Sequence, residues 1–148
     1  MPIVWRTDYA LRIMYEAACL GEGHHASVHV LAKRADVPYG FARQIANLLN
    51  HAGLLKSRRG SRGGFFLARP AAEITILQVF EAMGERLTMA LCTQESLCSR
   101  QELCPVHHDI WLPLDEMIKE HFRTVTIADV IAAGKRIKAE KGPLRTGS

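Results

Sequence analysis

Long apolar runs are absent from this 148-residue sequence. No stretch reaches the roughly 18 consecutive apolar residues that a membrane-spanning helix requires. The opening residues, MPIVWRTDYALR, reach charge at once, unlike a secretory leader. We therefore expect a cytoplasmic protein with no membrane partner, in a compartment where thiols stay reduced.

Cysteine is scarce except in one polar stretch, CTQESLCSRQELCPVH at residues 92–107, which holds three of the four cysteines. The spacing C-x5-C-x5-C-x2-H admits a disulfide framework, a structural zinc site or an iron–sulfur cluster. A reducing compartment and an odd number of thiols argue against disulfides. Zinc ligands usually come in pairs about two to four residues apart, so the wider spacing favours a cluster over zinc. We expect the remaining cysteine, Cys19, to be a small core residue.

Motifs that would carry enzyme chemistry are also absent. The sequence has no CxxC pair, no nucleophile elbow and no phosphate-binding loop. A thiol-redox enzyme is therefore a weak alternative, and we expect that the protein is not an enzyme.

Acidic residues are missing from positions 37–72, although the chain has 15 of them. The same window holds six of the 19 Lys and Arg residues, which exceeds the net charge of +4 for the whole chain and leaves the rest at −2. A localised basic patch of this kind is typical of a surface that binds a polyanion.

Hydrophobic periodicity predicts a helix-turn-helix in the first third of the chain. A helix begins near Thr7 as N-cap and stops at Gly21, and a second, capped by Ser27, covers 28–35. A third helix covers about 38–51, with Phe41, Ile45, Leu48 and Leu49 on its inner face and Tyr39, Arg43, Ala46, Asn47 and Asn50 on its outer face. We interpret three histidines between and within the first two helices, His24, His25 and His29, as solvated residues rather than metal ligands.

The next segments predict a wing and three further helices. Residues 54–58 and 64–68 suit a β-hairpin whose tip is rich in glycine. A helix at 74–83 follows, with Ile76, Val79, Phe80 and Met83 spaced for packing. Apolar residues then recur at helical spacing over 110–122, where Pro113 either kinks the helix or places its start near Leu112. A last short helix covers TVTIADVIAAGKRI.

This pattern predicts how the chain would bind DNA. A helix-turn-helix inserts its second helix into the major groove, where its first residues reach base edges. Arg can read guanine there, and wing arginines meet phosphate or enter the minor groove. The predicted DNA-binding residues, which we call the DNA face, are Tyr39, Gly40, Arg43, Asn47, Arg58, Arg59 and Arg62.

The sequence resembles the Rrf2 family of bacterial iron–sulfur winged-helix regulators, which includes IscR, NsrR and RirA. The resemblance covers roughly residues 5–133 and rests on TDYALRIM, LAKRADVPYGFARQIANLL, GLLKSRRGSRGGFFLARP, ITILQVFEAM, the three-cysteine loop and TIADV. It implies a dimer that reads a palindromic operator, with one iron–sulfur cluster per subunit held by Cys92, Cys98 and Cys104. Pro113 departs from the unbroken dimer helix of the family.

The resemblance leaves two candidates for the fourth cluster ligand. IscR-like proteins use the histidine at the position of His107 with a 2Fe–2S cluster, and some NsrR-like proteins use an aspartate at the position of Asp8, from the other subunit, with a 4Fe–4S cluster. A carboxylate is a harder ligand than thiolate and would make the iron labile, which suits a sensor. The sequence argument therefore favours Asp8 and 4Fe–4S, with His107 and 2Fe–2S as the alternative.

Together these features predict a mainly α fold with a small β-hairpin. The expected organisation is a winged helix-turn-helix at 1–84, a cysteine segment at 85–105, dimerisation helices at 106–134 and a flexible basic tail at 135–148. The predicted function is a cluster-containing DNA-binding transcriptional regulator, most simply a repressor, that senses iron or cluster status, nitric oxide or redox state. The alternatives are a zinc-stabilised or cluster-free winged-helix regulator.

Overall fold

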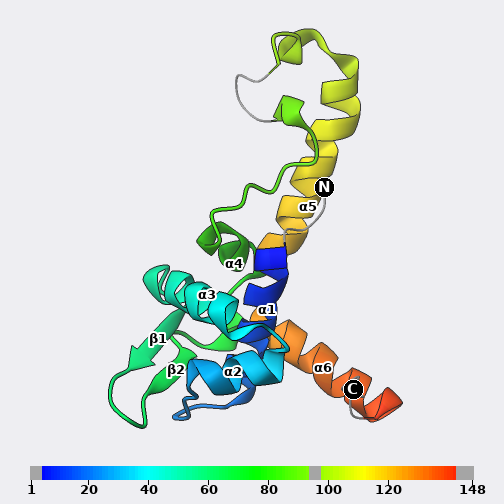
Figure 1. Cartoon of the computed structure of the whole chain (residues 1–148). Coiled ribbons are helices and arrows are strands. Elements are labelled where there is room, and N and C mark those ends of the chain that lie inside the picture. The colour runs from blue at the N-terminus through cyan, green and yellow to red at the C-terminus, as the bar shows by residue number, and fades with distance from the viewer. Residues whose placement is uncertain (1–4, 94–97, 143–148) are drawn as a thin grey trace.

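The computed structural model describes residues 5–93 and 98–142, which form six α-helices and one two-stranded antiparallel sheet (Figure 1). In chain order these elements are α1 Trp5–Cys19, α2 Val28–Ala35, α3 Tyr39–His51, β1 Leu55–Arg58, β2 Gly64–Leu67, α4 Ile76–Ala82, α5 Leu112–Thr124 and α6 Ile127–Lys141. Short helical turns lie between them: η1 Ala71–Glu73, η2 Leu91–Thr93, η3 Gln101–Leu103 and the π-helical η4 His107–Trp111. The predicted mainly α fold with a small hairpin is therefore confirmed.

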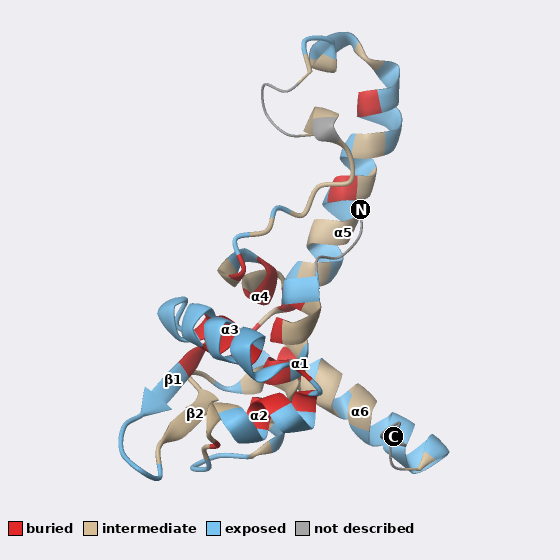
Figure 2. Cartoon of the chain, viewed as in Figure 1, coloured by how far each residue is buried: buried red, intermediate tan, exposed pale blue. Residues whose placement is uncertain are grey.

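The core forms around α1, which contacts α2, α3, α4, α6 and β2. Ile13 and Met14 of α1 are completely buried, as are Leu31 of α2 and Leu49 of α3. Figure 2 shows most of the buried residues gathered in the lower body of the molecule, whereas α5 is largely exposed. One continuous core therefore joins the winged helix-turn-helix to the start of α6, where Ile127 is completely buried.

The predicted helix-turn-helix is present, and its turn follows from local chemistry. Ser27 caps α2, with its Oγ accepting a hydrogen bond from the Val30 amide at 3.3 Å. Asp36 ends α2 in the left-handed conformation at φ 52°, and its amide donates to carbonyls in the last turn. Pro38 then fixes an extended start for α3. This sequence of cap, left-handed residue and proline sets the direction of α3.

The predicted wing is also present, and it is tied to the loop between α1 and α2. Strands β1 and β2 pair from Leu55 with Leu67 to Arg58 with Gly64. Ala26 bridges Phe65 through two backbone hydrogen bonds of 3.1 and 2.8 Å. A Cβ at Gly64 would lie 2.3 Å from the Ala26 carbonyl oxygen, so only glycine permits this approach.

Two capping boxes begin the later helices and hold them together. Thr75 and Gln78 form the first, at the start of α4, and Thr126 and Asp129 form the second, at the start of α6. The Thr126 amide and hydroxyl, by donating to the Asp129 carboxylate, hold the pKa of that carboxyl below its usual value. Thr75 and Thr126 also form an isolated antiparallel bridge, which joins the beginnings of α4 and α6.

Three sequence expectations about α1 and α3 are wrong. Thr7 is not an N-cap, because α1 begins at Trp5 and the Thr7 side chain is fully buried. Cys19 is exposed, because it lies on the side of α1 away from the buried Ala10, Met14 and Ala17 stripe. The orientation of α3 also differs from the prediction, as its small residues face the core.

On α3 the buried residues are Ala42, Ile45, Ala46 and Leu49. The large side chains Phe41 and Leu48 are 41% and 38% exposed, although we expected them in the core. Alanines on this face allow α3 to pack closely against α1 and α2, and this close packing turns the bulkier residues outward.

Helix α5 extends away from the body and has the cysteine segment beside its far end (Figure 1). Pro113 lies in the first turn of α5 and does not end the helical path. The π-helical η4 precedes this turn directly, and helical backbone runs from residue 105 to 124. The start near Leu112 that the sequence allowed is therefore confirmed, with an additional π-helical turn before it.

Helix α6 is longer than predicted. It continues through residues 135–141, which we assigned to a tail, and ends where Gly142 takes φ 75°. Its Gly134 lies against α1, where an added Cβ would come within 2.4 Å of the Tyr15 hydroxyl. Among the described residues, no helix is long and apolar enough to cross a membrane.

Candidate DNA-binding face and cysteine segment

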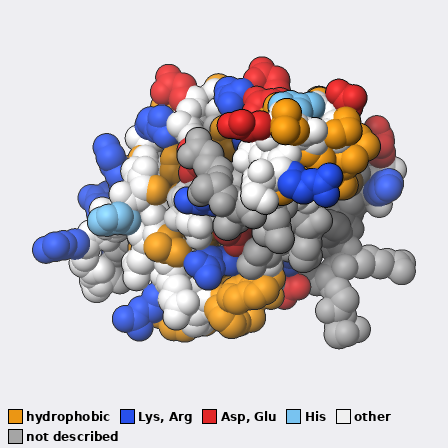
Figure 3. Space-filling view, turned by 90° about the horizontal axis from the view of Figure 1, so that it is seen from above, with side chains coloured by type: hydrophobic (Ala, Val, Ile, Leu, Met, Phe, Trp, Pro, Cys, Tyr) orange, Lys and Arg blue, Asp and Glu red, His pale blue; other side chains and the backbone are white. Residues whose placement is uncertain are grey.

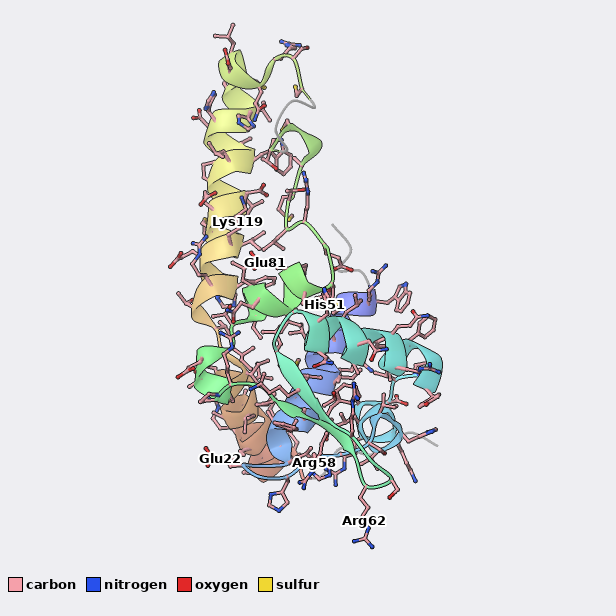
Figure 4. The ribbon with its side chains drawn as sticks, turned by 90° about the vertical axis from the view of Figure 1, so that its left-hand side faces the viewer. Glu22, His51, Arg58, Arg62, Glu81 and Lys119 are labelled. Carbon is pink, nitrogen blue, oxygen red and sulfur yellow. The ribbon has the colours of Figure 1, made fainter. Side chains whose placement is uncertain are left out.

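The seven residues of the DNA face are all exposed, and they lie on α3 and the wing. Figure 4 shows Arg58 and Arg62 on the hairpin arm, with Arg62 at its outer end. Tyr39, Gly40 and Arg43 occupy the first two turns of α3. The structure therefore leaves all seven predicted residues accessible to a partner.

The wing tip is held in place by a residue that the sequence analysis treated as solvated. His25 Nε2 lies 2.5 Å from the carbonyl oxygen of Arg62, and the residues are 37 positions apart in the chain. Together with the bridge between Ala26 and Phe65, this contact fastens the hairpin to the loop before α2. The wing is thus supported by two segments distant in sequence.

A second histidine lies against the start of α3. The His29 ring of α2 stacks on the Tyr39 ring with centroids 3.9 Å apart and planes 8° from parallel. Pro38, at the N-cap position, makes no side-chain capping bond, and Tyr39 is 42% exposed. The stack is consequently a specific side-chain contact at the end of α3 that would meet base edges.

The described thiols of the cysteine segment are free, and none is fully buried. Cys92, Cys98 and Cys104 are half-buried, on or beside η2 and η3. Residues 94–97, between the first two thiols, lie outside the described residues. Within the described part of the chain, no three His, Cys, Asp or Glu side chains converge on a point that could hold a metal ion. The structure thus provides suitable donors for a thiolate-bound cofactor, but they are not assembled into a binding site.

His107, one of the predicted cluster ligands, lies in a buried environment. It is 3% exposed, and among the described residues no hydrogen-bond partner reaches its Nδ1 atom. Its turn, η4, packs against η2, which contains Cys92. The Nε2 atom of the neighbouring His108 lies 3.0 Å from the carbonyl oxygen of Glu102. The backbone N–H of His108 donates to the carbonyl oxygen of Cys104. A buried imidazole nitrogen without a partner is unfavourable by about 1–3 kcal/mol unless it binds something.

Asp8 lies in different surroundings. Its carboxylate pairs with Arg12 at 2.8 Å, one helical turn away, and both side chains are about half exposed. Asp8 belongs to α1 in the body of the molecule, whereas the turns η2 and η3 of the cysteine segment lie beside the far end of α5 (Figure 1). An exposed pair of this kind contributes only about 0.3–0.5 kcal/mol, so the carboxylate can readily exchange partners.

Two further side chains, which the sequence analysis missed, anchor the start of the cysteine segment. The Thr7 hydroxyl donates to Glu85, and the Asp115 carboxylate of α5 accepts a 2.6 Å hydrogen bond from the Met89 amide. Thr7 and Asp115 are both buried. Their sequence neighbours include the charged Arg6, Asp8 and Glu116, so the local sequence gives no clear signal of such a role.

Large apolar side chains are exposed on η4 and α5. Met117 of α5 is 70% exposed and Ile110 of η4 is 52% exposed. Beside them lies a groove of about 420 Å³ lined by Leu87, Met89, Leu114, Met117, Ile118, His121 and Phe122. Figure 3, which looks down on this end of the molecule, shows hydrophobic side chains at the surface among charged ones. Such an exposed apolar surface is typical of an interaction site.

Comparison with known proteins identifies the family. The Rrf2 family, described as iron-dependent transcriptional regulators, matches residues 4–133. The chain belongs to the Rrf2 family. The IscR regulator of Serratia proteamaculans is 25% identical to it over 131 residues, which cover 88% of this chain and 79% of that protein.

Solved structures share the fold of this Rrf2 protein. CymR of B. subtilis, titled a global cysteine regulator, aligns with a TM-score of 0.77 at 22% identity, over 90% of this chain and 98% of that one. IscR of T. potens aligns with a TM-score of 0.70 at 20% identity, over 99% and 94%. The chain is therefore a winged-helix DNA-binding transcriptional regulator and not an enzyme, as the sequence predicted.

Proposed function

We propose that this Rrf2 protein is a homodimeric repressor that binds a palindromic operator and responds to an iron–sulfur cluster held by its cysteine segment. The observation that carries the cluster proposal is the buried Nδ1 of His107, which has no hydrogen-bond partner among the described residues and lies next to a segment with three free thiols. A bound cluster would supply a centre that iron limitation, oxidants or nitric oxide can disrupt. The DNA proposal rests on the exposed, acid-free surface of α3 and the wing.

In the proposed complex, α3 lies in the major groove and the wing follows the backbone. Arg43, one turn after Tyr39, is positioned to read guanine, while Arg58, Arg59 and Arg62 meet phosphates or the minor groove. Replacing Arg43 with Ala should weaken operator binding by about 1–3 kcal/mol and relax specificity at one base pair. Replacing Arg59 with Ala should weaken binding to all sequences and lower the salt slope by about one unit. Unchanged binding by both variants would exclude this docking surface.

The proposed dimer uses the apolar side of α5. Its groove and the exposed Met117 and Ile110 side chains are covered by nothing in the described chain. A two-fold dimer would present two α3 helices to successive turns of the major groove, which is the arrangement that reads a palindrome.

Cys92, Cys98 and Cys104 are the proposed cluster thiolates, and two residues compete for the fourth position. The sequence argument favoured Asp8 with a 4Fe–4S cluster. His107 is buried and its Nδ1 has no hydrogen-bond partner among the described residues, which favours the alternative, whereas nothing about the exposed pair of Asp8 with Arg12 points to a missing ligand. We therefore rank His107 with 2Fe–2S ahead of Asp8 from the partner subunit with 4Fe–4S.

The anchors of the cysteine segment provide a route from that segment to DNA. Glu85 is bonded to Thr7 of α1, and α1 packs against both α2 and α3. Met89 is bonded to Asp115 of α5, the proposed dimer helix. A change in the order of the segment therefore acts on two helices that set the separation of the two α3 helices, and so on the population of DNA-competent dimers.

Metal analysis with absorption spectroscopy tests the proposal. Protein purified without oxygen should be brown and contain iron and sulfide in nearly equal amounts. Replacing Cys92, Cys98 or Cys104 with Ala should remove the colour, and Cys19→Ala, at an exposed thiol on α1, is the matched control that should keep it. Stoichiometric zinc without visible absorbance would instead identify a zinc-stabilised regulator, and metal-free protein that represses fully would identify a cluster-free one.

The fourth ligand is tested by comparing His107→Ala with Asp8→Ala by absorption and native mass spectrometry. We expect His107→Ala to destroy or convert the cluster and Asp8→Ala to resemble the unmodified protein. The opposite pattern would assign the position to Asp8 of the partner subunit and restore the 4Fe–4S alternative.

A further inference from the structure

The three histidines near the start of α2 have no part in the proposed cluster site, yet two of them touch elements that would face DNA. His25 contacts the wing through Arg62, and His29 stacks on Tyr39. His24 instead makes only a local contact with the carbonyl of Glu22, 2.9 Å away. His29, which stacks on a side chain of another helix, therefore differs from His24, which has the local contact expected of a solvated histidine.

Tyr39 has little else in the described chain to define the direction of its ring. It is the first residue of α3, it is 42% exposed, and the preceding Pro38 provides no side-chain cap. The stack on His29 is nearly parallel, at 8°, with ring centroids 3.9 Å apart. A ring at this distance limits the rotamers that Tyr39 can adopt before DNA arrives.

From this geometry we infer that His29, which is outside the DNA face, is a positioning residue for sequence recognition. It holds the Tyr39 ring in the orientation that meets the major groove, so the operator does not have to order that side chain. Immobilising one side chain at an interface opposes binding, and fixing it in advance removes that cost. The inference rests on the proposed docking of α3, because Tyr39 matters only if that end of α3 meets base edges.

The inference assigns His29 a role through its ring rather than through its charge. A histidine that bound phosphate directly would contribute to all duplexes and would change the salt dependence by about one unit. A positioning histidine instead contributes only where Tyr39 makes its contact, so its effect depends on the Tyr39 ring and on the sequence of the duplex. A flat apolar ring can replace it, because stacking needs neither a proton nor a hydrogen bond.

The experiment uses the full chain and two duplexes: one that the unmodified protein selects from a random-sequence pool, and a scrambled version of it. His29→Ala should weaken binding to the selected duplex roughly 2- to 10-fold, the range expected when one side chain loses its preorganisation. Its affinity for the scrambled duplex and its salt slope should not change. His29→Phe should restore most of the affinity, and His24→Ala is the matched control with no expected effect.

A double substitution completes the test. In a Tyr39→Ala background, His29→Ala should cost nothing more, because the ring that it positions is gone. The inference is overturned if His29→Ala behaves like His24→Ala, or if its effect persists in the Tyr39→Ala background and lowers the salt slope. Arg43→Ala separates this outcome from a failure of the docking surface: if Arg43→Ala is also without effect, the proposed docking of α3 is wrong as well.

Discussion

Replacing Gly40 with Ala should change fold stability and DNA affinity in opposite directions. Gly40 is the second residue of α3, and an added Cβ would have no neighbour within 4 Å. Alanine in a helix is more stable than glycine by roughly 0.5–1 kcal/mol, because glycine loses more backbone freedom on folding. For a chain of this length we therefore expect the melting temperature to rise by about 1–4 °C.

The same methyl group should weaken operator binding. It would stand on the exposed end of α3 beside Tyr39, where the proposed complex brings the backbone close to the bases. If the methyl group keeps the α3 backbone away from the bases, the free energy of operator binding should become less favourable by about 1–3 kcal/mol, the contribution of one base contact. This corresponds to a loss of affinity of roughly 5- to 150-fold. Thermal unfolding and titration with the selected duplex measure the two effects independently.

Gly134→Ala is the matched control, because it is the same substitution in another helix. There the new Cβ would lie 2.4 Å from the Tyr15 hydroxyl, so the Tyr15 ring has to move and the gain in melting temperature should be reduced or lost. Operator affinity per folded molecule should stay unchanged, since α6 carries none of the DNA face. A Gly40→Ala protein that is more stable and binds the operator normally would refute the close approach of α3 to DNA.

Three further substitutions test other parts of the molecule. Gly64→Ala would press a methyl group against the Ala26 carbonyl and should break the two hydrogen bonds of the wing bridge. Chemical denaturation should show a loss of stability of about 1–3 kcal/mol, and operator binding should weaken. Normal stability and binding would contradict this packing. Asp115→Ala removes a buried hydrogen bond to Met89 and should cost about 1.5–3 kcal/mol and speed amide exchange in the cysteine segment, whereas an unchanged exchange pattern would exclude Asp115 as its anchor. Met117→Glu, at a side chain that is 70% exposed, should leave the monomer fold intact and shift the dimer to monomer in sedimentation, and a persisting dimer would move the interface elsewhere.

Much of the fold follows from local sequence signals. The Ser27 cap, the Pro38 start and the glycine-rich hairpin act within a few residues of themselves, and each occurs where the sequence predicts it. The spacing of apolar residues was enough to predict α4, because its large side chains Ile76, Val79 and Phe80 are buried as expected. These elements are specified by chemistry that a short window of sequence contains.

The errors occur where a distant part of the chain decides the outcome. Thr7 has the side chain of a good N-cap, but its partner is Glu85, 78 positions away. Ala46 is buried and Phe41 exposed because α3 packs closely on its neighbours, and side-chain size alone suggested the reverse. Periodicity gives the existence of a helix, whereas its rotation depends on the shape of what it packs against.

The candidate site divides along the same line. The exposure of the DNA face could be predicted from charge and position, while its role in binding stays a prediction. His29 could not, since its contact with Tyr39 requires α2 and α3 to be placed first. The orphaned nitrogen of His107 likewise depends on how η4 packs, although its position near Cys104 was visible in the sequence.

The anchoring of residues 85–89 has a consequence for how such a regulator can diversify. Because Glu85 and Met89 are bonded to α1 and α5, the cysteine segment is joined to the scaffold near its start, and its described residues from 90 to 106 add no buried side chain to the core. Its length, ligands and chemistry can therefore change without repacking the helices that carry the DNA face. Signal and operator become separately exchangeable parts, and a chimaera that takes only residues 90–106 from another member of the family should keep its operator while answering to a new stimulus.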